Sequence, residues 1–231
     1  MLTFVEWQAV RLTLLVATVA VIVSLPAAVA IGWLLAKRQF PGKFVVETLV
    51  NLPLVLPPVV TGYLLILAFG RQGWIGSFME RAFGIRFIFD WKGAALASAV
   101  VAFPLLVRPI RLAFSAIDDR LIQAARTLGA SPLDAFWSIM LPLARPGILS
   151  GSILAFARSM GDFGATIMLA GNIPGRTQTV PLLIYSQLDA PNGMEQSIRL
   201  VVASIVIAAA ALFIGELLNR YGIERLRGAS A

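Results

Sequence analysis

The chain has 231 residues, of which 58% are hydrophobic and 13% are charged, and its mean hydropathy is +0.85. Soluble domains carry about 25% charged residues, so this composition indicates an integral membrane protein. The sequence contains no Cys and no His, which excludes a disulfide framework, a thiolate metal site and the commonest proton carrier. We interpret the net charge of +7 as membrane-orienting charge, not as a nucleic-acid surface.

Five apolar stretches reach the roughly 20 residues that a membrane-spanning helix needs: 11–36, 44–69, 93–114, 147–170 and 198–218. The first could be mistaken for a secretory signal because it contains the sequence PAAVA. Its apolar run is well beyond the ~7–15 residues of a signal-peptide core, so we expect an uncleaved span. The sequence therefore predicts an all-α integral membrane protein that forms one transmembrane domain over residues 1–231.

Lys and Arg favour one orientation of these spans. If the N-terminus faces outward, eleven of the 19 Lys and Arg residues fall in inner segments or toward the inner ends of spans, seven fall in outer segments or at the outer ends of spans, and Arg158 falls in the interior of a span. Positive residues gather on the cytoplasmic side of membrane proteins. We therefore expect a multi-pass protein of the inner or plasma membrane, with the N-terminus outside and the C-terminus in the cytoplasm.

Two short amphipathic helices are predicted in the cytoplasmic segment 118–142. Asp118 or Asp119 can cap the start of the first, and Gly129 stands where a left-handed C-terminal cap is expected. Ser131 and Pro132 then begin the second helix, with an acidic residue at its third position as in a capping box.

Apolar residues of the second short helix repeat at i, i+3, i+4 and i+7, which predicts one apolar face: Leu133, Phe136, Trp137 and Met140. Pro142 is expected to end this helix. The pattern alone fits either a helix pair that lies on the membrane surface or a rigid unit that docks into a cytoplasmic partner.

Prolines interrupt the second span. Pro53, Pro57 and Pro58 lack an N–H donor and clash with the preceding helical turn. Backbone groups released in this way need partners in protein or water, since lipid offers none. This indicates either a structural kink or a helix that lines a translocation pathway. The candidate pathway residues here are Asn51, Pro57, Pro58, Thr61 and Gly62.

The fourth span combines small residues with two opposite charges. Arg158 and Asp162 are four residues apart and so share a helix face. An unpaired charge at the bilayer centre costs about 2.5–3.5 kcal/mol, so the two form either a structural ion pair or a site where Arg158 attracts an anion. Gly164 and Thr166 are further pathway candidates. Small residues at four-residue steps permit close helix packing: Gly147, Gly151, Ala157, Gly161 and Ala165.

The spacing within residues 123–142 resembles a cytoplasmic motif of ABC importer membrane subunits, which reads Glu-Ala-Ala, three residues, Gly, nine residues and Ile-x-Leu-Pro. Gln123 replaces Glu, which removes a charge but keeps an acceptor. The matching residues are Gln123, Ala124, Ala125, Gly129, Ile139, Leu141 and Pro142. The resemblance implies that this helix pair, with Ser131 and Pro132 at its turn, docks into a groove of a separate ATPase subunit.

The sequence contains no G-x-x-x-x-G-K-[ST] phosphate loop. ATP and Mg²⁺ are therefore expected on the partner subunit, and neither a cofactor nor a metal is expected on this chain.

Residues 161–189 resemble the permeases of tetrahedral oxyanion importers, at positions 162–165, 171–177, 179, 181–182 and 184–185. The sequence GNIPGRTQT at 171–179 and the sequence PLVLPPVVTGYLL at 53–65 resemble the molybdate branch of these permeases most. The resemblance implies the fold of a type I ABC importer transmembrane domain and import of molybdate or tungstate. It also implies a second copy of this chain as partner, two ATP-binding subunits and an extracytoplasmic oxyanion-binding protein. Asn172 and Arg176 lie in the expected outer loop, which is either a contact for that binding protein or a plain polar turn.

Other functions have less support. A sulfate or thiosulfate importer differs in the ion and not in the mechanism. An ATP-independent channel or carrier would leave the 118–142 segment without a role. A membrane enzyme lacks its usual groups, since the sequence has no His or Cys and no carboxylate pair within a span. We therefore expect no catalytic residue in this chain.

Overall fold

The computed structural model describes residues 3–188 and 193–228, and within them all regular structure is helical. The helices are α1 (Phe4–Lys37), α2 (Lys43–Val55), α3 (Pro58–Phe69), α4 (Trp74–Phe83), α5 (Trp91–Ser115), α6 (Asp119–Thr127), α7 (Pro132–Ala135), the π-helix η1 (Phe136–Met140), α8 (Leu141–Met160), α9 (Gly164–Ala170), α10 (Val180–Leu188) and α11 (Gly193–Gly228).

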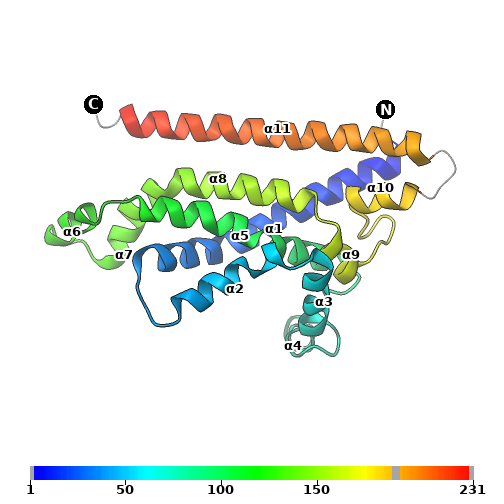
Figure 1. The fold of residues 1–231 in the computed structure, drawn as a ribbon, viewed down its shortest axis with the longest axis horizontal. Helices are drawn as coiled ribbons and strands as arrows, with labels where there is room; N and C mark the ends of the chain where they lie inside the picture. The colour runs from blue at the N-terminus through cyan, green and yellow to red at the C-terminus, as the bar shows by residue number, and fades with distance from the viewer. Residues whose placement is uncertain (1–2, 189–192, 229–231) are drawn as a thin grey trace.

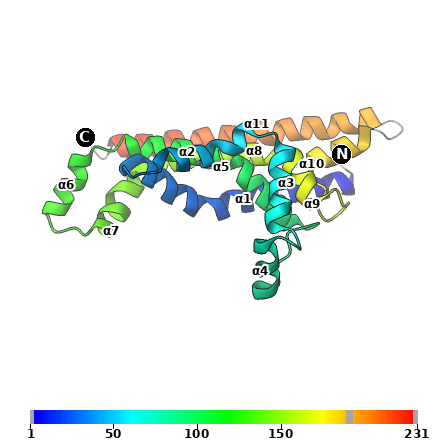
Figure 2. The same cartoon turned by 60° about the horizontal axis from the view of Figure 1, so that its bottom comes forward.

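The long helices run along the longest axis of the molecule (Figure 1), and α5 packs between α1 and α8 while α11 packs on α8. Helices α6 and α7 lie at one end of this layer, and α10 and the start of α1 lie at the other (Figure 1). Helices α3 and α4 project out of the layer (Figure 2). The two ends are therefore distinct, and α11 ends beside the end that carries α6.

Close approach to α5 holds the layer together. Leu106, Ile110 and Phe114 on α5 are fully buried. A Cβ atom on Gly32 of α1 would lie 2.7 Å from the Ile110 Cγ2 atom, and one on Gly151 of α8 would lie 2.7 Å from the Leu106 carbonyl oxygen. Lipid tails are as apolar as these side chains, so such backbone contact supplies much of the association energy.

The first predicted span starts earlier in the structure than the sequence predicts, and the second is divided into two helices. Helix α1 begins at Phe4, earlier than the predicted 11–36 stretch, because Thr3 and Glu6 form a capping box at its start. The predicted 44–69 span is two helices, α2 and α3, bent by 118° at the break. Pro57 and Pro58 explain the break, since neither can donate to the preceding turn.

The fourth predicted span also differs. Residues 132–160 are helical without interruption from α7 through η1 into α8, so the expectation that Pro142 ends the second short helix is wrong. Within η1 the hydrogen bonds widen, and the Leu141 N–H donates to the Phe136 carbonyl. The π-turn widens the backbone just before Pro142, and the helix continues through this proline and through Pro146. The helix instead ends at Met160, and α9 follows after three residues.

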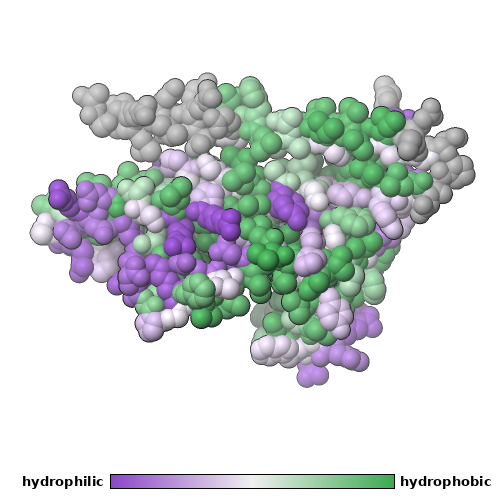
Figure 3. Space-filling view, in the orientation of Figure 1, coloured by the Kyte–Doolittle hydropathy of each residue, from purple (hydrophilic) through white to green (hydrophobic). Residues whose placement is uncertain are grey.

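In the described residues, three helices are long and apolar enough to cross a membrane, and the bent pair α2–α3 makes a fourth candidate. The predicted 198–218 span lies on α11, whose apolar part, Ser197–Phe213, is shorter. Hydrophobic residues cover much of the middle of the visible face, and hydrophilic residues gather near α6, α7 and α4 (Figure 3). This distribution fits a protein surrounded by lipid at mid-length.

We predict that Gly151→Val separates α8 from α5, because the new Cβ would lie 2.7 Å from a backbone oxygen that cannot rotate away. The expected loss is about 1–3 kcal/mol of stability, measured as a lower thermal unfolding midpoint of the detergent-solubilised protein. Gly161→Ala is the control, since its Cβ would meet only the Arg158 carbonyl oxygen at 4.0 Å. Equal midpoints for the two variants would contradict the close approach.

Candidate functional site

The end of the molecule that carries α6 presents an exposed apolar surface. Asp118 caps α6 by accepting a hydrogen bond of 2.9 Å from the Arg120 N–H. No residue of α6 is buried, and Leu128 is 90% exposed. Leu121 is also exposed. A helix of this length with an open apolar side needs a partner surface, whether lipid or protein.

Gly129 fixes the direction of the chain after α6. Its φ of +96° lies in the left-handed region, which confirms the predicted cap. The Ala130 N–H donates to the Ala125 carbonyl at 3.0 Å, and the Gly129 N–H donates to the Arg126 carbonyl at 3.1 Å. These two bonds form a Schellman motif. A Cβ on Gly129 would meet nothing within 4 Å, so backbone conformation alone favours glycine here.

A capping box starts α7, as predicted. The Asp134 N–H donates to the Ser131 hydroxyl oxygen at 3.1 Å, and the Ser131 N–H donates to the Asp134 carboxylate at 3.1 Å. Hydrogen bonds from the Ser131 hydroxyl and N–H lower the pKa of Asp134. Its contribution to the cap is therefore complete above its ordinary pKa and is lost only as the pH falls through the lowered value.

The same end is anchored to the helical layer. The Lys37 ammonium at the end of α1 donates to the Ile117 carbonyl at 2.6 Å and to Asp119 Oδ1 at 2.5 Å. The Phe136 ring packs edge-on against Trp33, with centroids 5.9 Å apart, and stacks on Phe114. These contacts hold the α6–α7 unit at a fixed angle to α1 and α5.

The predicted apolar face of the second short helix is divided in the structure. Met140 is buried and Phe136 is partly buried, but Leu133 is exposed and Trp137 is 64% exposed. Phe136 and Met140 therefore pack on the helical layer. Leu133 and Trp137 stay exposed, as Leu121 and Leu128 do. Of the motif residues, Gln123, Ala124, Gly129, Ser131 and Pro132 are exposed, and Ala125, Ile139, Leu141 and Pro142 are partly buried.

Several predicted pathway residues lie in helix packing. A Cβ on Gly62 would lie 2.7 Å from the Met168 Cβ atom, and one on Gly164 would lie 2.9 Å from the Pro58 Cβ atom. Thr61 is buried, while Pro57 is exposed at the break. Gly62 and Gly164 thus place α3 against α9, directly after the break between α2 and α3 that the prolines create.

Asp162 is buried in the turn between α8 and α9. Its Oδ2 atom accepts a hydrogen bond of 2.6 Å from the Thr166 hydroxyl, and Arg158 Nη1 lies 4.0 Å from Oδ1. Thr166 is buried, whereas the Arg158 side chain is partly exposed. The pair is loose, so both predicted roles of Arg158, as an ion-pair partner and as an anion attractor, remain predictions.

Helices α2 and α5 share two polar contacts that sequence reasoning missed. The Arg108 Nε atom donates to Asn51 Oδ1 at 2.8 Å. One turn away, Arg111 Nη2 lies 2.9 Å from Glu47 Oε1. The available signal was the spacing, since Glu47 and Asn51 are four residues apart and the arginines are three apart, so each pair occupies one helix face.

The predicted outer loop is an ordered turn. Arg176 Nη2 lies 3.3 Å from Asp90 Oδ2 at the start of α5. The Thr177 hydroxyl accepts a hydrogen bond of 2.9 Å from the Ile173 N–H. The Asn172 Oδ1 atom is buried and has no hydrogen-bond partner in the described residues. A role of Asn172 or Arg176 in binding a partner stays a prediction.

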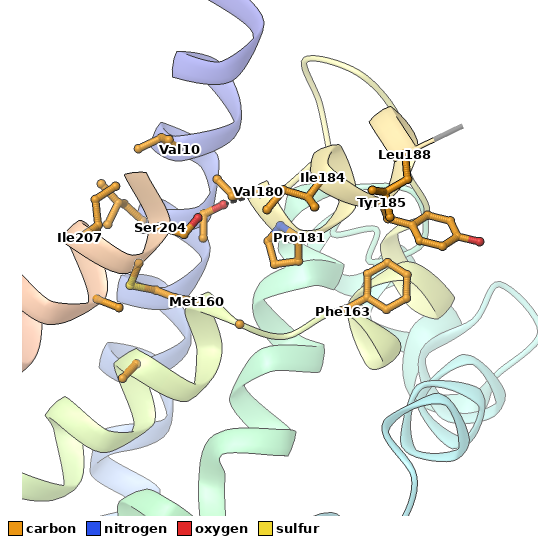
Figure 4. Close-up of a pocket in the computed structure, with 15 residues that line it drawn as sticks. Val10, Met160, Phe163, Val180, Pro181, Ile184, Tyr185, Leu188, Ser204 and Ile207 are labelled. Carbon is orange, nitrogen blue, oxygen red and sulfur yellow. Dashed lines mark hydrogen bonds between the residues drawn. The ribbon is translucent and has the colours of Figure 1, made fainter. Parts of the chain in front are cut away.

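A cavity of about 490 Å³ lies among α1, α8, α10 and α11. The Phe163 and Tyr185 rings flank it, with centroids 5.1 Å apart (Figure 4). Its lining is almost wholly apolar and includes no Lys or Arg, so it offers a dianion no positive charge. No group of three His, Cys, Asp or Glu side chains suited to a metal occurs within residues 3–188 and 193–228.

Comparison with known families identifies the chain. Residues 28–227 match the family described as binding-protein-dependent transport system inner membrane components. The chain belongs to this family. It is therefore a permease-type component of the inner membrane with several apolar helices.

Relatives match almost the full length. The molybdenum transport system permease protein ModB of Escherichia coli (strain K12) is 51% identical over 224 residues, which cover 97% of this chain and 98% of that protein. ModB of Haemophilus influenzae is 50% identical over 215 residues, or 93% and 94% of the two chains. The sulfate transport system permease protein CysT of Salmonella typhimurium is more distant, at 34% identity over 93% of this chain and 77% of that protein.

Solved structures show the same fold at low identity. The inward-facing MetNI methionine ABC transporter gives a TM-score of 0.68 at 18% identity and covers 94% of both chains. A bacterial alginate ABC transporter in complex with its periplasmic protein gives 0.71 at 15% identity, over 93% of this chain and 78% of that one. The predicted fold class, an all-α type I ABC importer transmembrane domain, is confirmed.

We predict that Lys37→Met loosens the start of α6, because the Ile117 carbonyl and Asp119 lose a shared cationic donor. Asp119 is well exposed, so we expect a cost of about 1 kcal/mol, or roughly fivefold faster local opening. Amide hydrogen exchange of residues 118–130 measures this rate of local opening. Lys43→Met is the control, since that ammonium contacts only the Arg38 carbonyl. Unchanged exchange in the Lys37 variant would contradict the anchoring role.

Proposed function

We propose that this chain is the membrane permease subunit of an ATP-driven importer that moves molybdate, or the similar dianion tungstate, into the cell. The observation that carries the proposal is the 51% identity to a molybdenum transport permease along 97% of this chain. Similarity spread over the whole length supports a shared mechanism better than one matched motif does.

The α6–α7 unit is the proposed link to a separate ATPase subunit, which binds ATP and Mg²⁺ and performs hydrolysis. Leu121, Leu128, Leu133 and Trp137 expose an apolar surface at one end of the molecule. The Schellman turn and the capping box set the angle between the two helices. A short, rigid amphipathic helix is suited to a groove in a partner.

A second copy of this chain is the proposed partner within the membrane. The bent pair α2–α3 exposes apolar side chains on its outer side, and Val55 at the break is 82% exposed. A two-fold homodimer would give the solute a path between two copies. Two ATPase subunits and an extracytoplasmic oxyanion-binding protein complete the proposed assembly.

The proposed orientation places the N-terminus outside and the C-terminus in the cytoplasm. The start of α1 lies at the end opposite α6, and α11 ends beside α6 (Figure 1). An ATPase partner must sit in the cytoplasm, so the α6 end would face inward.

The alternative solute is sulfate, which the more distant relatives suggest, or its analogue thiosulfate. An ATP-independent channel or carrier is the alternative mechanism. The identity of the solute and the energy source of transport need separate measurements.

We predict that the permease, reconstituted in proteoliposomes with its ATPase and binding protein, takes up radiolabelled molybdate only when ATP is present. Omitting the ATPase is the control for the mechanism. Uptake without ATPase or ATP would favour the channel or carrier. Direct titration of the binding protein with molybdate, tungstate and sulfate decides the ion, and tighter binding of sulfate would favour the alternative importer.

We predict that Gly129→Val uncouples ATP hydrolysis from uptake, because a β-branched residue is strained at a φ of +96°. Uptake should fall at least tenfold, while Gly129→Asn, which tolerates the left-handed region, should retain most of it. Both variants add a side chain where a Cβ meets nothing within 4 Å, so a steric clash with neighbouring residues does not explain a difference between them. Normal coupled uptake in the valine variant would show that the turn is not needed.

A further inference from the structure

The two polar contacts between α2 and α5 differ in charge. The Glu47–Arg111 contact is an ion pair of 2.9 Å, so its charges cancel. The Arg108 Nε atom instead donates to a neutral amide oxygen, that of Asn51, at 2.8 Å. Arg108 forms no ion pair with a carboxylate in the part of the chain that the structure describes. One positive charge on this face is therefore uncompensated.

Asn51 fixes the direction of the Arg108 guanidinium. The Asn51 Nδ2 atom donates to the Glu47 carbonyl at 2.6 Å, which turns the amide oxygen toward Arg108. Arg108 is exposed, and its two terminal nitrogens have no hydrogen-bond partner within residues 3–188 and 193–228. A planar guanidinium whose two terminal nitrogens are both open can bind two oxygens of one oxyanion.

The position of Arg108 along α5 limits what it can face. Arg108 lies seven positions before the end of α5 at Ser115, which is about 10 Å of helix. Long cationic side chains near a helix end often extend to the interface. Here the bond to Asn51, eight residues into α2, holds the guanidinium beside α2 and keeps it from extending toward the helix end. A cation at this depth is costly against lipid, so it faces protein or water.

We infer that Arg108, oriented by Asn51, is a transient contact for the tetrahedral dianion in the half of the pathway nearest α6. This inference rests on the proposed function. One exposed cation from each copy attracts a dianion without enclosing it, and conduction requires a site that the ion can leave. Arg111 cannot play this role while Glu47 neutralises it.

Three variants of the full transporter in proteoliposomes test the inference. Arg108→Gln removes the charge. Asn51→Asp keeps the size of the side chain but pairs Arg108 with a carboxylate, which compensates the charge. The double variant Glu47→Gln/Arg111→Gln is the control, because it removes the neighbouring neutral pair from the same two helices.

The maximum rate of molybdate uptake should fall at least tenfold in Arg108→Gln and Asn51→Asp and stay within twofold of wild type in the control. The concentration of loaded binding protein that gives half-maximal uptake should not change, because the contact forms after the ion is released into the pathway. ATPase activity stimulated by the binding protein should persist in all three.

Uptake at the wild-type rate in Asn51→Asp would overturn the inference. If Arg108→Gln instead prevents dimer assembly, measured by light scattering after size-exclusion chromatography, and Asn51→Asp assembles and transports normally, Arg108 is a structural contact and the inference is also wrong. Absence of ATP-dependent uptake in wild type would refute the proposed function itself, so the two failures are distinguishable.

Discussion

Contact between helix backbones around α5 is the constraint on which the rest of the structure depends. Gly32 on α1 and Gly151 on α8 leave no room for a side chain against α5. In a membrane, where apolar burial offers little driving force between helices, such contact determines which helices become neighbours. Once α1 and α8 are placed in this way, α11 packs on α8, and α6 and α7 are brought to one end of the layer.

The second constraint is the need to satisfy backbone groups where helices break. The breaks after Leu56 and after Met160 lie close together, because Gly164 of α9 packs on Pro58 of α3. The contact buries Gly164 and part of Pro58, and backbone groups beside a break need such protein or water partners because lipid offers none. The two charges of the fourth span, Arg158 and Asp162, belong to this same region.

Much of the fold could be predicted from the sequence, because the signals involved are local. The left-handed cap at Gly129 and the capping box at Ser131 depend on a few adjacent residues, and both occur as expected. Helix bounds were less predictable. Proline suggests a helix end at Pro142, but a π-turn just before it lets the helix continue. Hydrogen-bond widening of this kind leaves no clear pattern in composition or spacing.

The candidate site was predictable only in part, because contacts between distant segments have no local signature. The sequence predicts Gly62 and Gly164 as pathway residues, which stays a prediction, but it does not reveal that they pack α3 on α9. Arg108 appears in the sequence only as an inner positive charge, yet it contacts Asn51, 57 residues away in the chain. Both cases concern residues whose neighbours are set by tertiary packing.

The uninterrupted helix from Pro132 to Met160 has a mechanical consequence. Its 29 residues extend about 43 Å at 1.5 Å per residue, a length similar to the full thickness of a bilayer with its head groups. One end carries the exposed Trp137, and the other ends beside Asp162. The features that let this helix bend, the π-turn at Phe136–Met140 and the prolines at 142 and 146, all lie toward the Trp137 end. The remaining part, residues 147–160, can therefore carry a movement imposed at the Trp137 end to the end beside Asp162.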